Sequence, residues 1–290
     1  MLTRAFLLHA LSPLHAGTGQ AAGIVDLPIA RYRSTGIPFV PGSSIKGVLR
    51  DARRANGVEK DDLLLAVFGP DTDNAAAHAG ALVVGDARLL ALPVRSFRGT
   101  FAWVSSPLLL ELARRDLGEV ASGLNLPSLA GRAARVVNGS TCLFENKIYL
   151  EDLDLPAEVD PGCVGWARFL SPLVSPGADI FSKRFAVVDD DTMSFVMETA
   201  TQLDARVRLD SETRTVAKGA LWLEESLPPE SLLLGLLAAD RSRKKDFEMT
   251  AREVLDFALA NETVLQLGGK ATVGRGRCRM VPVAGAGAER

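Results

Sequence analysis

The 290-residue sequence contains few of the residues that build disulfide frameworks and metal clusters. Its three cysteines, Cys142, Cys163 and Cys278, lie far apart in the chain, and it has only three histidines. A disulfide framework needs paired cysteines, and a structural zinc site needs closely spaced Cys or His ligands. The sequence therefore supports neither kind of site.

The sequence also has no long apolar run, few aromatic residues and little net charge. No apolar run is long enough to span a membrane and no cleavage signature follows the N-terminal residues, so we expect a cytoplasmic protein without a membrane partner. Aromatic residues make up only 6% of the chain, and its scattered tryptophans favour core or interface positions over a base-stacking platform. The net charge of −2 argues against a free-standing nucleic-acid-binding protein, which usually carries a broad positive field.

What the chain does contain is a glycine-framed basic turn near each end. The first covers residues 40–50 (VPGSSIKGVLR) and the second covers residues 267–277 (LGGKATVGRGR). Glycine lets the backbone approach an anion, which a lysine or arginine then neutralises. The first turn lacks the Walker A spacing, which excludes an NTPase. Alone, each turn could be an ordinary helix start or strand connection, but together they favour an extended phosphate ligand such as a nucleic-acid backbone.

The first turn is predicted to open a helix. Ser43 or Ser44 would be its N-cap, and the helix would run to about Asn56 and stop at Gly57. Four basic residues follow the face opposite the apolar one: Lys46, Arg50, Arg53 and Arg54. This basic stripe begins at the helix N-terminus, where the helix dipole also favours anions. A solvated basic face without a ligand is the alternative.

Hydrophobic periodicity along the rest of the chain predicts an α+β fold. The expected strands are 3–10, 82–84, 89–94, 101–104 and 263–267, and the expected helices are 61–68, 107–115 and 251–259. Residues 199–225 predict a two-stranded ribbon, and 232–238 could be strand or helix. The order β-α-β followed by β-α-β is that of the ferredoxin-like or RRM-like fold, here with long insertions. We expect one domain over residues 1–283 and a disordered tail over 284–290.

Residues 11–38 form a long segment rich in glycine and proline, and loops of this length are more often functional than idle. Within it, Asp26 is either a solvated turn residue or a general base or metal ligand beside an RNA phosphate. His15 is either satisfied by backbone at a strand end or assists the chemistry. A later run, Asp189–Asp191, precedes an apolar helical segment, which favours carboxylates that complement a helix dipole over a metal site.

Several of these segments resemble, in the same order, the RAMP superfamily of CRISPR effector proteins. They are residues 15–19 (HAGTG), 25–31 (VDLPIAR), 36–50 and 268–276, and the middle section over 205–228 is similar too. Within the superfamily, the chain most resembles the repeated backbone subunit, the fourth subunit, of the type III-B Cmr complex. The similarity covers nearly the whole chain.

This resemblance implies an RRM-like palm with a finger loop over about residues 16–38 and a thumb hairpin within about 183–226. It also implies that copies stack into a helical filament along a guide RNA, together with other Cmr subunits. Each copy would hold about six nucleotides, so that affinity accumulates along the strand by multivalency. The thumb would displace one nucleotide per copy from the duplex of guide RNA and target RNA.

The resemblance also implies roles for particular residues. The residues expected to contact RNA are Ser43, Ser44, Lys46, Arg50, Arg53, Gly269 and Lys270. Asp26 would lie beside the target RNA at each displaced nucleotide and support its cleavage, by accepting a proton or by holding a divalent cation, Mg²⁺ or Mn²⁺. His15 could assist.

Three alternatives remain. The chain could be a catalytically silent RNA-binding scaffold of the same kind of complex, or the related type III-A backbone subunit. It could also be a stand-alone guide-RNA-processing ribonuclease, although such an enzyme would want a histidine-centred site and this chain has little histidine to offer.

Overall fold

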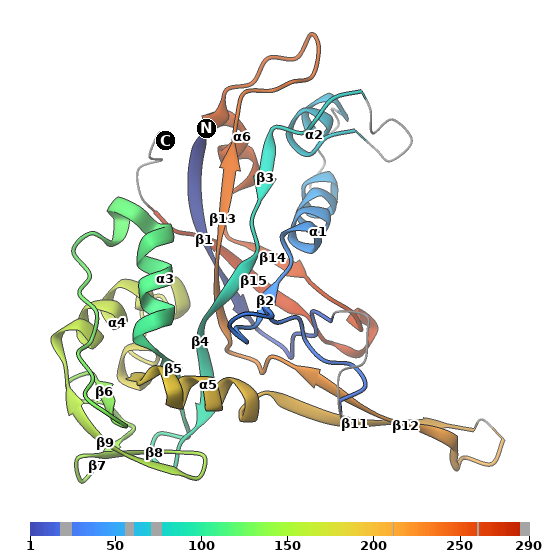
Figure 1. Ribbon diagram of the computed structural model, residues 1–290. Coiled ribbons are helices and arrows are strands. Elements are labelled where there is room, and N and C mark those ends of the chain that lie inside the picture. The colour runs from blue at the N-terminus through green and yellow to red at the C-terminus, as the bar shows by residue number, and fades with distance from the viewer. Residues whose placement is uncertain (18–24, 56–60, 71–76, 211, 260, 285–290) are drawn as a thin grey trace.

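A computed structural model describes residues 1–17, 25–55, 61–70, 77–210, 212–259 and 261–284. Most of its strands join one mixed sheet in the order β14-β15-β1-β13-β4-β5-β10-β6-β9-β8-β7, with β2 beside β4 and β3 beside β13 (Figure 1). The strands of this sheet are β1 (Leu2–Ala10), β2 (Phe39–Val40), β3 (Leu82–Val84), β4 (Ala87–Arg95), β5 (Phe101–Ser105), β6 (Ala134–Val136), β7 (Leu143–Phe144), β8 (Lys147–Leu150), β9 (Leu153–Val159), β10 (Phe185–Val188), β13 (Leu232–Ala239), β14 (Thr263–Gln266) and β15 (Arg277–Pro282).

Helices cover the sheet, and the architecture is therefore α+β. They are α1 (Gly42–Ala55), α2 (Asp61–Phe68), α3 (Pro107–Leu117), α4 (Pro161–Val174), α5 (Asp190–Thr199) and α6 (Ala251–Ala258). No helix among the described residues is long and apolar enough to cross a membrane.

Strand β1 lies between β13 and β15 and is antiparallel to both. Its alternating side chains enter two different clusters, because successive residues of a strand point to opposite faces. Phe6 and Leu8 pack in one cluster with Leu49 of α1, whereas Leu7 packs in the other with Trp166 of α4. Both faces of the sheet are buried here, which explains why β1 is an almost continuous apolar run. In Figure 1, α1 and α2 lie on one side of these strands and α3 and α4 on the other.

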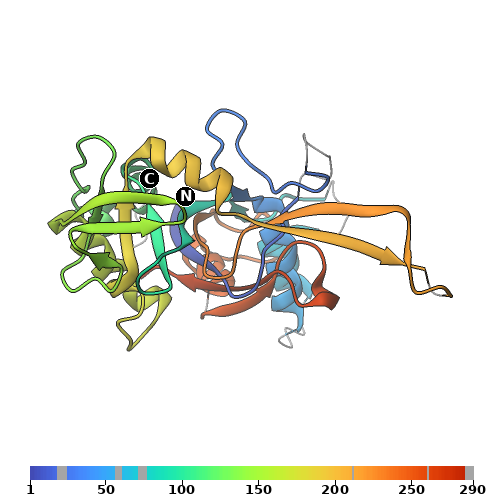
Figure 2. The same cartoon turned by 90° about the horizontal axis from the view of Figure 1, so that it is seen from below.

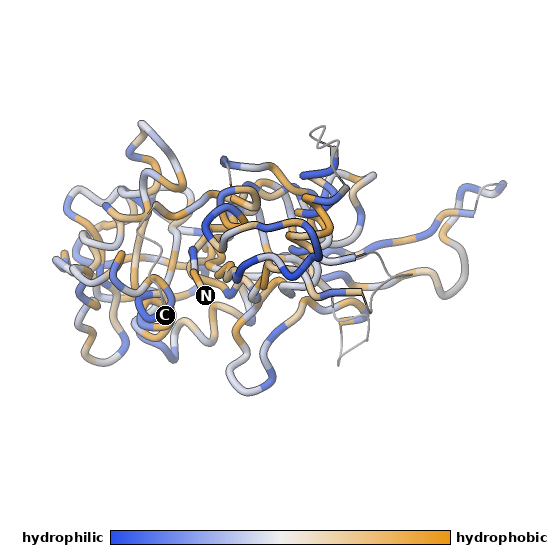
Figure 3. The backbone as a smooth tube through the Cα atoms, turned by 90° about the horizontal axis from the view of Figure 1, so that it is seen from above, coloured by the Kyte–Doolittle hydropathy of each residue, from blue (hydrophilic) through white to orange (hydrophobic). Residues whose placement is uncertain are grey.

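A two-stranded hairpin of β11 (Gln202–Leu209) and β12 (Val216–Ser226) forms a separate sheet and projects from the body (Figures 1 and 2). Hydrophilic and hydrophobic residues alternate along it (Figure 3). Five large apolar side chains on the hairpin are exposed: Leu203, Val207, Leu209, Val216 and Leu221. Cross-strand partners share a face, so Val207 and its partner Leu221 lie on the same apolar side.

Most of the expected elements are present, with one correction. Helix α1 begins at Gly42, so Ser43 and Ser44 lie in its first turn and the prediction that one of them is the N-cap is wrong. The cap comes from outside the helix, because the N–H of Gly42 donates to Asp86 Oδ1 at 2.8 Å. A hairpin, β11 and β12, lies within the range of about 183–226 expected for the thumb, and the first part of that range also holds β10, which pairs with β5 and β6 in the main sheet. The predicted helix end at Asn56 and Gly57, and nearly all of the tail, lie outside the described residues.

Candidate nucleic-acid interface

The segment that carries Asp26 runs beside β12 at the root of the hairpin. Asp26 Oδ2 accepts a hydrogen bond from the backbone N–H of Leu223 at 2.8 Å. The N–H of Leu27 donates to the carbonyl of Leu223 at 3.1 Å, and the N–H of Glu225 donates to the carbonyl of Leu27 at 3.0 Å. Asp26 itself remains exposed. Its carboxylate is thus held in one orientation on a surface that a ligand can reach.

Glu225 attaches this segment to β12 through a buried carboxylate. Its Oε2 accepts a hydrogen bond from the N–H of Ile29 at 3.1 Å, and its Oε1 pairs with Arg31 at 2.6 Å. Arg31 also donates to the carbonyls of Met197 at 2.9 Å and Gly36 at 3.2 Å. The Asp26 segment is therefore connected to both the hairpin and the last turn of α5.

His15 is nearly buried and is hydrogen-bonded to backbone, as one of the two sequence interpretations proposed. Its Nδ1 lies 2.6 Å from the carbonyl oxygen of Glu225. Because a carbonyl only accepts, Nδ1 must carry the proton, and in the neutral ring Nε2 is the acceptor. Close neighbours crowd the residue: a Cβ added at Gly17 would lie 2.5 Å from Nε2, and one added at Gly268 would lie 2.2 Å from the His15 carbonyl oxygen. Whether His15 takes part in catalysis stays a prediction.

The two glycine-framed turns, distant in sequence, meet around one hollow of about 300 Å³. Its walls include Ser44 from the first turn and Gly268 and Gly269 from the second, together with His15 and Leu27. Ser44 is exposed in the first turn of α1, where the helix dipole favours an anion and the N–H of Gly42 already bonds the Asp86 carboxylate. The prediction that both turns serve one ligand requires this proximity.

Lys46 follows Ser44 on α1 and is half-buried. Its Nζ donates to the carbonyl of Leu82 at 3.0 Å. Burial, and secondarily the charge of Arg50, lower the pKa of Lys46 from its ordinary value. Its ammonium group therefore already has one partner within the protein.

Arg53 does not belong to the solvated stripe, and that part of the prediction is wrong. Its side chain is buried, and its Nη2 donates to the carbonyl of Ala258 at 2.8 Å and to Thr263 Oγ1 at 3.2 Å. Burial lowers the pKa of Arg53. The reason lies in the packing, because α6 and β14 cover this side of α1, and the guanidinium satisfies a carbonyl at the C-terminal end of α6.

The second turn is joined to the hairpin by an ionic cluster that the sequence analysis missed. We define the anchor cluster as Asp204, Arg206, Glu224, Lys270 and Arg275. Lys270, in the left-handed conformation with φ 68°, pairs with the fully buried carboxylate of Glu224. Arg275 is also buried and pairs with Asp204 at 2.6 Å. Lys270, predicted to contact RNA, is therefore ion-paired within the protein.

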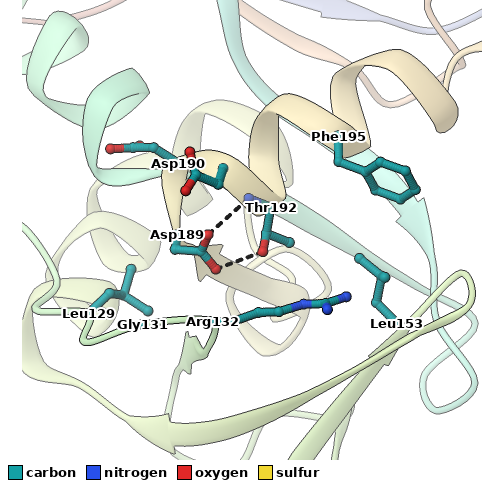
Figure 4. A pocket seen from close by; sticks show the side chains of 9 residues that line it. Leu129, Gly131, Arg132, Leu153, Asp189, Asp190, Thr192 and Phe195 are labelled. Atoms are coloured by element: carbon teal, nitrogen blue, oxygen red, sulfur yellow. Dashed lines mark hydrogen bonds between the residues drawn. The ribbon is translucent and has the colours of Figure 1, made fainter.

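The run Asp189–Asp191 begins α5, as expected. Asp189 is the N-cap: its two oxygens accept from the N–H of Thr192 at 2.9 Å and from Thr192 Oγ1 at 2.7 Å (Figure 4). Asp190 Oδ1 accepts from the N–H of Leu108 at 2.9 Å. These contacts confirm the helix-terminus interpretation. Across the described residues, no group of three or more His, Cys, Asp or Glu side chains is placed to hold a metal ion.

Comparison with known proteins identifies the family. The model of the RAMP superfamily matches residues 7–279. The chain belongs to the RAMP superfamily. Within this superfamily it is a member of the Cmr4 family, since it is 36% identical over 277 residues to the CRISPR system Cmr endoribonuclease Cmr4 of Pyrococcus furiosus, a match that covers 93% of this chain and 92% of that protein. The CRISPR system CMR subunit Cmr4 of Saccharolobus solfataricus is 23% identical, with 93% of each chain covered.

Solved structures agree with this membership of the RAMP superfamily. The crystal structure of oligomeric Cmr4 from Pyrococcus furiosus has a TM-score of 0.74 and 28% identity, and the match covers 97% of this chain and 98% of that one. A chain in the cryo-EM structure of the type III-B Cmr-beta complex bound to cognate target RNA shares the fold, with a TM-score of 0.76, 22% identity and 98% of each chain covered. The resemblance found in the sequence is thereby confirmed.

Proposed function

We propose that this Cmr4-family protein is the repeated backbone subunit of a type III-B complex, and that it cleaves target RNA bound to the guide RNA. One observation carries the proposal: the exposed Asp26 carboxylate is fixed at the root of the projecting hairpin by the N–H of Leu223. The names of the relatives support it, since one is called an endoribonuclease and another structure is a complex bound to target RNA. We further propose that the chain acts in the cytoplasm.

The fold supports an assignment of parts. We propose that β1–α1–β4 and β13–α6–β15 form the ferredoxin-like palm, because each is a β-α-β unit and their strands lie together in the sheet. The loop before β2 would be the finger, of which residues 18–24 lie outside the described part. The hairpin of β11 and β12 would be the thumb. Its exposed apolar side suits contact with unstacked bases, which present apolar faces.

The guide RNA would follow the surface around the hollow between the two turns. Ser43 and Ser44 at the start of α1 would receive phosphate oxygens, with Lys46, Arg50 and the backbone at Gly269 further along the same track. Lys270 would bind a phosphate of this track only if its ion pair with Glu224 were broken. Arg53 does not belong to this track, because its guanidinium is bonded inside the protein. A few contacts per copy are enough when many copies bind one strand.

Cleavage of an RNA strand by one of its own 2′-hydroxyl groups requires a particular geometry. The attacking oxygen, the phosphorus and the leaving oxygen must lie almost in line, which a regular A-form duplex prevents. A thumb that displaces one nucleotide per copy would allow that arrangement, an effect of orientation. Asp26 would accept the 2′-proton, a contribution of about 10²–10⁴ in rate. The products would be a 2′,3′-cyclic phosphate and a 5′-hydroxyl.

The residues present fit a loosely held divalent cation. Asp26 offers one exposed carboxylate, too few for a protein cage but suited to Mg²⁺ or Mn²⁺ that keeps waters and also binds phosphate oxygens. Such an ion would neutralise charge that develops on the phosphate. Asp26 is the only residue to which we assign this role.

The test is target-RNA cleavage by the reconstituted complex, with Asp26→Asn beside the wild type, in Mg²⁺ and in EDTA. Asparagine keeps an oxygen for the N–H of Leu223 but cannot accept the proton. We expect a ladder of products spaced by about six nucleotides, one per copy along the strand, that disappears in the variant while target binding persists. Asp152→Asn, an exposed carboxylate in a turn between β8 and β9, is the matched control. A ladder that survives in Asp26→Asn would make the chain a scaffold on which another group cuts.

A further inference from the structure

All the polar groups of Glu225 contact the segments that carry Asp26 and His15. Its N–H donates to the carbonyl of Leu27 at 3.0 Å, and its carbonyl accepts from His15 Nδ1 at 2.6 Å. Its carboxylate accepts from the N–H of Ile29 at 3.1 Å and pairs with Arg31 at 2.6 Å. The residue is buried, at 6% exposed, so these contacts are shielded from water.

The carboxylate holds the Asp26 segment where it leaves the surface of β12. Asp26 accepts a hydrogen bond from the N–H of Leu223, and the backbone of Leu27 next to it bonds to Leu223 and Glu225, so this end of the segment is attached to β12. Further along, the N–H of Ile29 and the guanidinium of Arg31 both attach to Glu225. Because Arg31 also donates to the carbonyl of Met197, the same contact orients the segment against α5.

Removing the charge at Glu225 would weaken both attachments. Arg31, whose side chain is only partly buried, would keep its backbone carbonyl partners but would lose the anion that holds it against β12. A displacement of a catalytic group by about 1 Å can cost about 10²-fold in rate. The loss would therefore appear in the chemical step rather than in target binding.

We propose that Glu225 is a positioning residue that sets the place of the Asp26 carboxylate relative to the target RNA. It acts through Ile29 and Arg31 and does not touch the RNA. This role rests on the proposed function of Asp26.

The experiment measures single-turnover cleavage by the reconstituted complex for Glu225→Gln, with Asp26→Asn measured beside it. Glutamine keeps the side-chain length and one oxygen for the N–H of Ile29, but it cannot form the ion pair with Arg31. We expect the rate at saturating target to fall by about tenfold to 10²-fold, while the target concentration for half-maximal rate changes by less than about twofold. Glu230→Gln is the matched control, because that carboxylate contacts His9 and not the Asp26 segment, and we expect it to keep the wild-type rate.

A second variant tests the same contact from its other partner. Arg31→Gln should also lower the rate. The double variant Glu225→Gln/Arg31→Gln should lose no more than the larger of the two single losses, because both changes remove the same ion pair. Melting temperatures of all variants show whether the fold persists. This series also remains informative if Glu225→Gln assembles poorly.

Each outcome separates the two proposals. If Asp26→Asn cuts at the wild-type rate, the proposed function fails whatever Glu225 does. If Asp26→Asn is inactive but Glu225→Gln and Arg31→Gln keep the wild-type rate, the positioning role is overturned. It is also overturned if target binding falls in proportion to the rate, because the residue would then only support the hairpin.

Discussion

Replacing Gly276 with alanine should destabilise the protein more than the same change at Gly274. Both residues lie in the second glycine-framed turn and both have left-handed φ angles, 77° and 79°. Their surroundings differ. A Cβ at Gly276 would lie 1.9 Å from the carbonyl oxygen of Leu267, whereas a Cβ at Gly274 would meet nothing within 4 Å. The pair therefore separates conformational strain from steric collision.

The magnitude follows from what must move. Alanine in the left-handed region costs about 1–2 kcal/mol at either position. At Gly276 the collision is with backbone, so the turn must shift and lose two hydrogen bonds: Leu267 N–H to the Gly276 carbonyl at 2.8 Å and Gly276 N–H to the Pro13 carbonyl at 2.9 Å. At about 0.5–1.5 kcal/mol each, the total becomes about 2–5 kcal/mol. For a chain of this size, that is a fall in melting temperature of about 4–10 °C, against about 2–4 °C for Gly274→Ala.

Thermal unfolding of the two purified variants, followed by circular dichroism beside the wild type, measures the difference. Equal shifts for the two variants would refute the reasoning, because they would show that the close approach of Gly276 to Leu267 does not constrain the turn. A larger loss for Gly274→Ala would refute it as well.

Two other predictions concern the basic helix and the thiols. Lys46→Ala should reduce the slope of log binding constant against log salt concentration for guide RNA by about 0.7 per copy. Arg53→Ala should leave that slope unchanged and lower the melting temperature, because its buried guanidinium satisfies a carbonyl of α6. Equal slopes for the two variants would contradict this contrast. Burial raises the pKa of the thiols of Cys142 and Cys163, and that of Cys278 to about 12, so at pH 8 all three remain protonated. A thiol reagent such as DTNB should therefore react with none of them in the native protein and with all three in denaturant, and prompt reaction of one native equivalent would contradict the burial.

The sequence predicts the palm well because its signals there are local. Strand β1 and helix α6 illustrate this: β1 is a short apolar run, and α6 begins with a capping box in which Thr250 and Glu253 bond reciprocally. The part from β6 to β10 was not predicted. Its strands are mostly of two to four residues, and α4 contains Pro172, which obscures helical periodicity.

The candidate site could be predicted only as far as residues that stand in a conspicuous local segment. Asp26 and His15 stand in a glycine-rich segment that attracts attention by its composition. Glu225 could not be recognised from a local pattern, because its partners Ile29 and Arg31 are far away in the sequence. Arg53 shows the reverse error: helical spacing alone places it in a basic stripe, and only the packing of α6 against α1 shows that it is buried.

The central place of β1 has a consequence for how the chain is made. This strand, Leu2–Ala10, is synthesised long before its two neighbours in the sheet, β13 (Leu232–Ala239) and β15 (Arg277–Pro282). At roughly 5–20 residues per second, the ribosome needs about ten seconds or more to supply the first partner. During that time β1 is an apolar strand whose two edges have no strand to pair with. The central strands of the sheet are thus complete only after β15 has been made, and slower growth at lower temperature with chaperone assistance should raise the yield of folded chain.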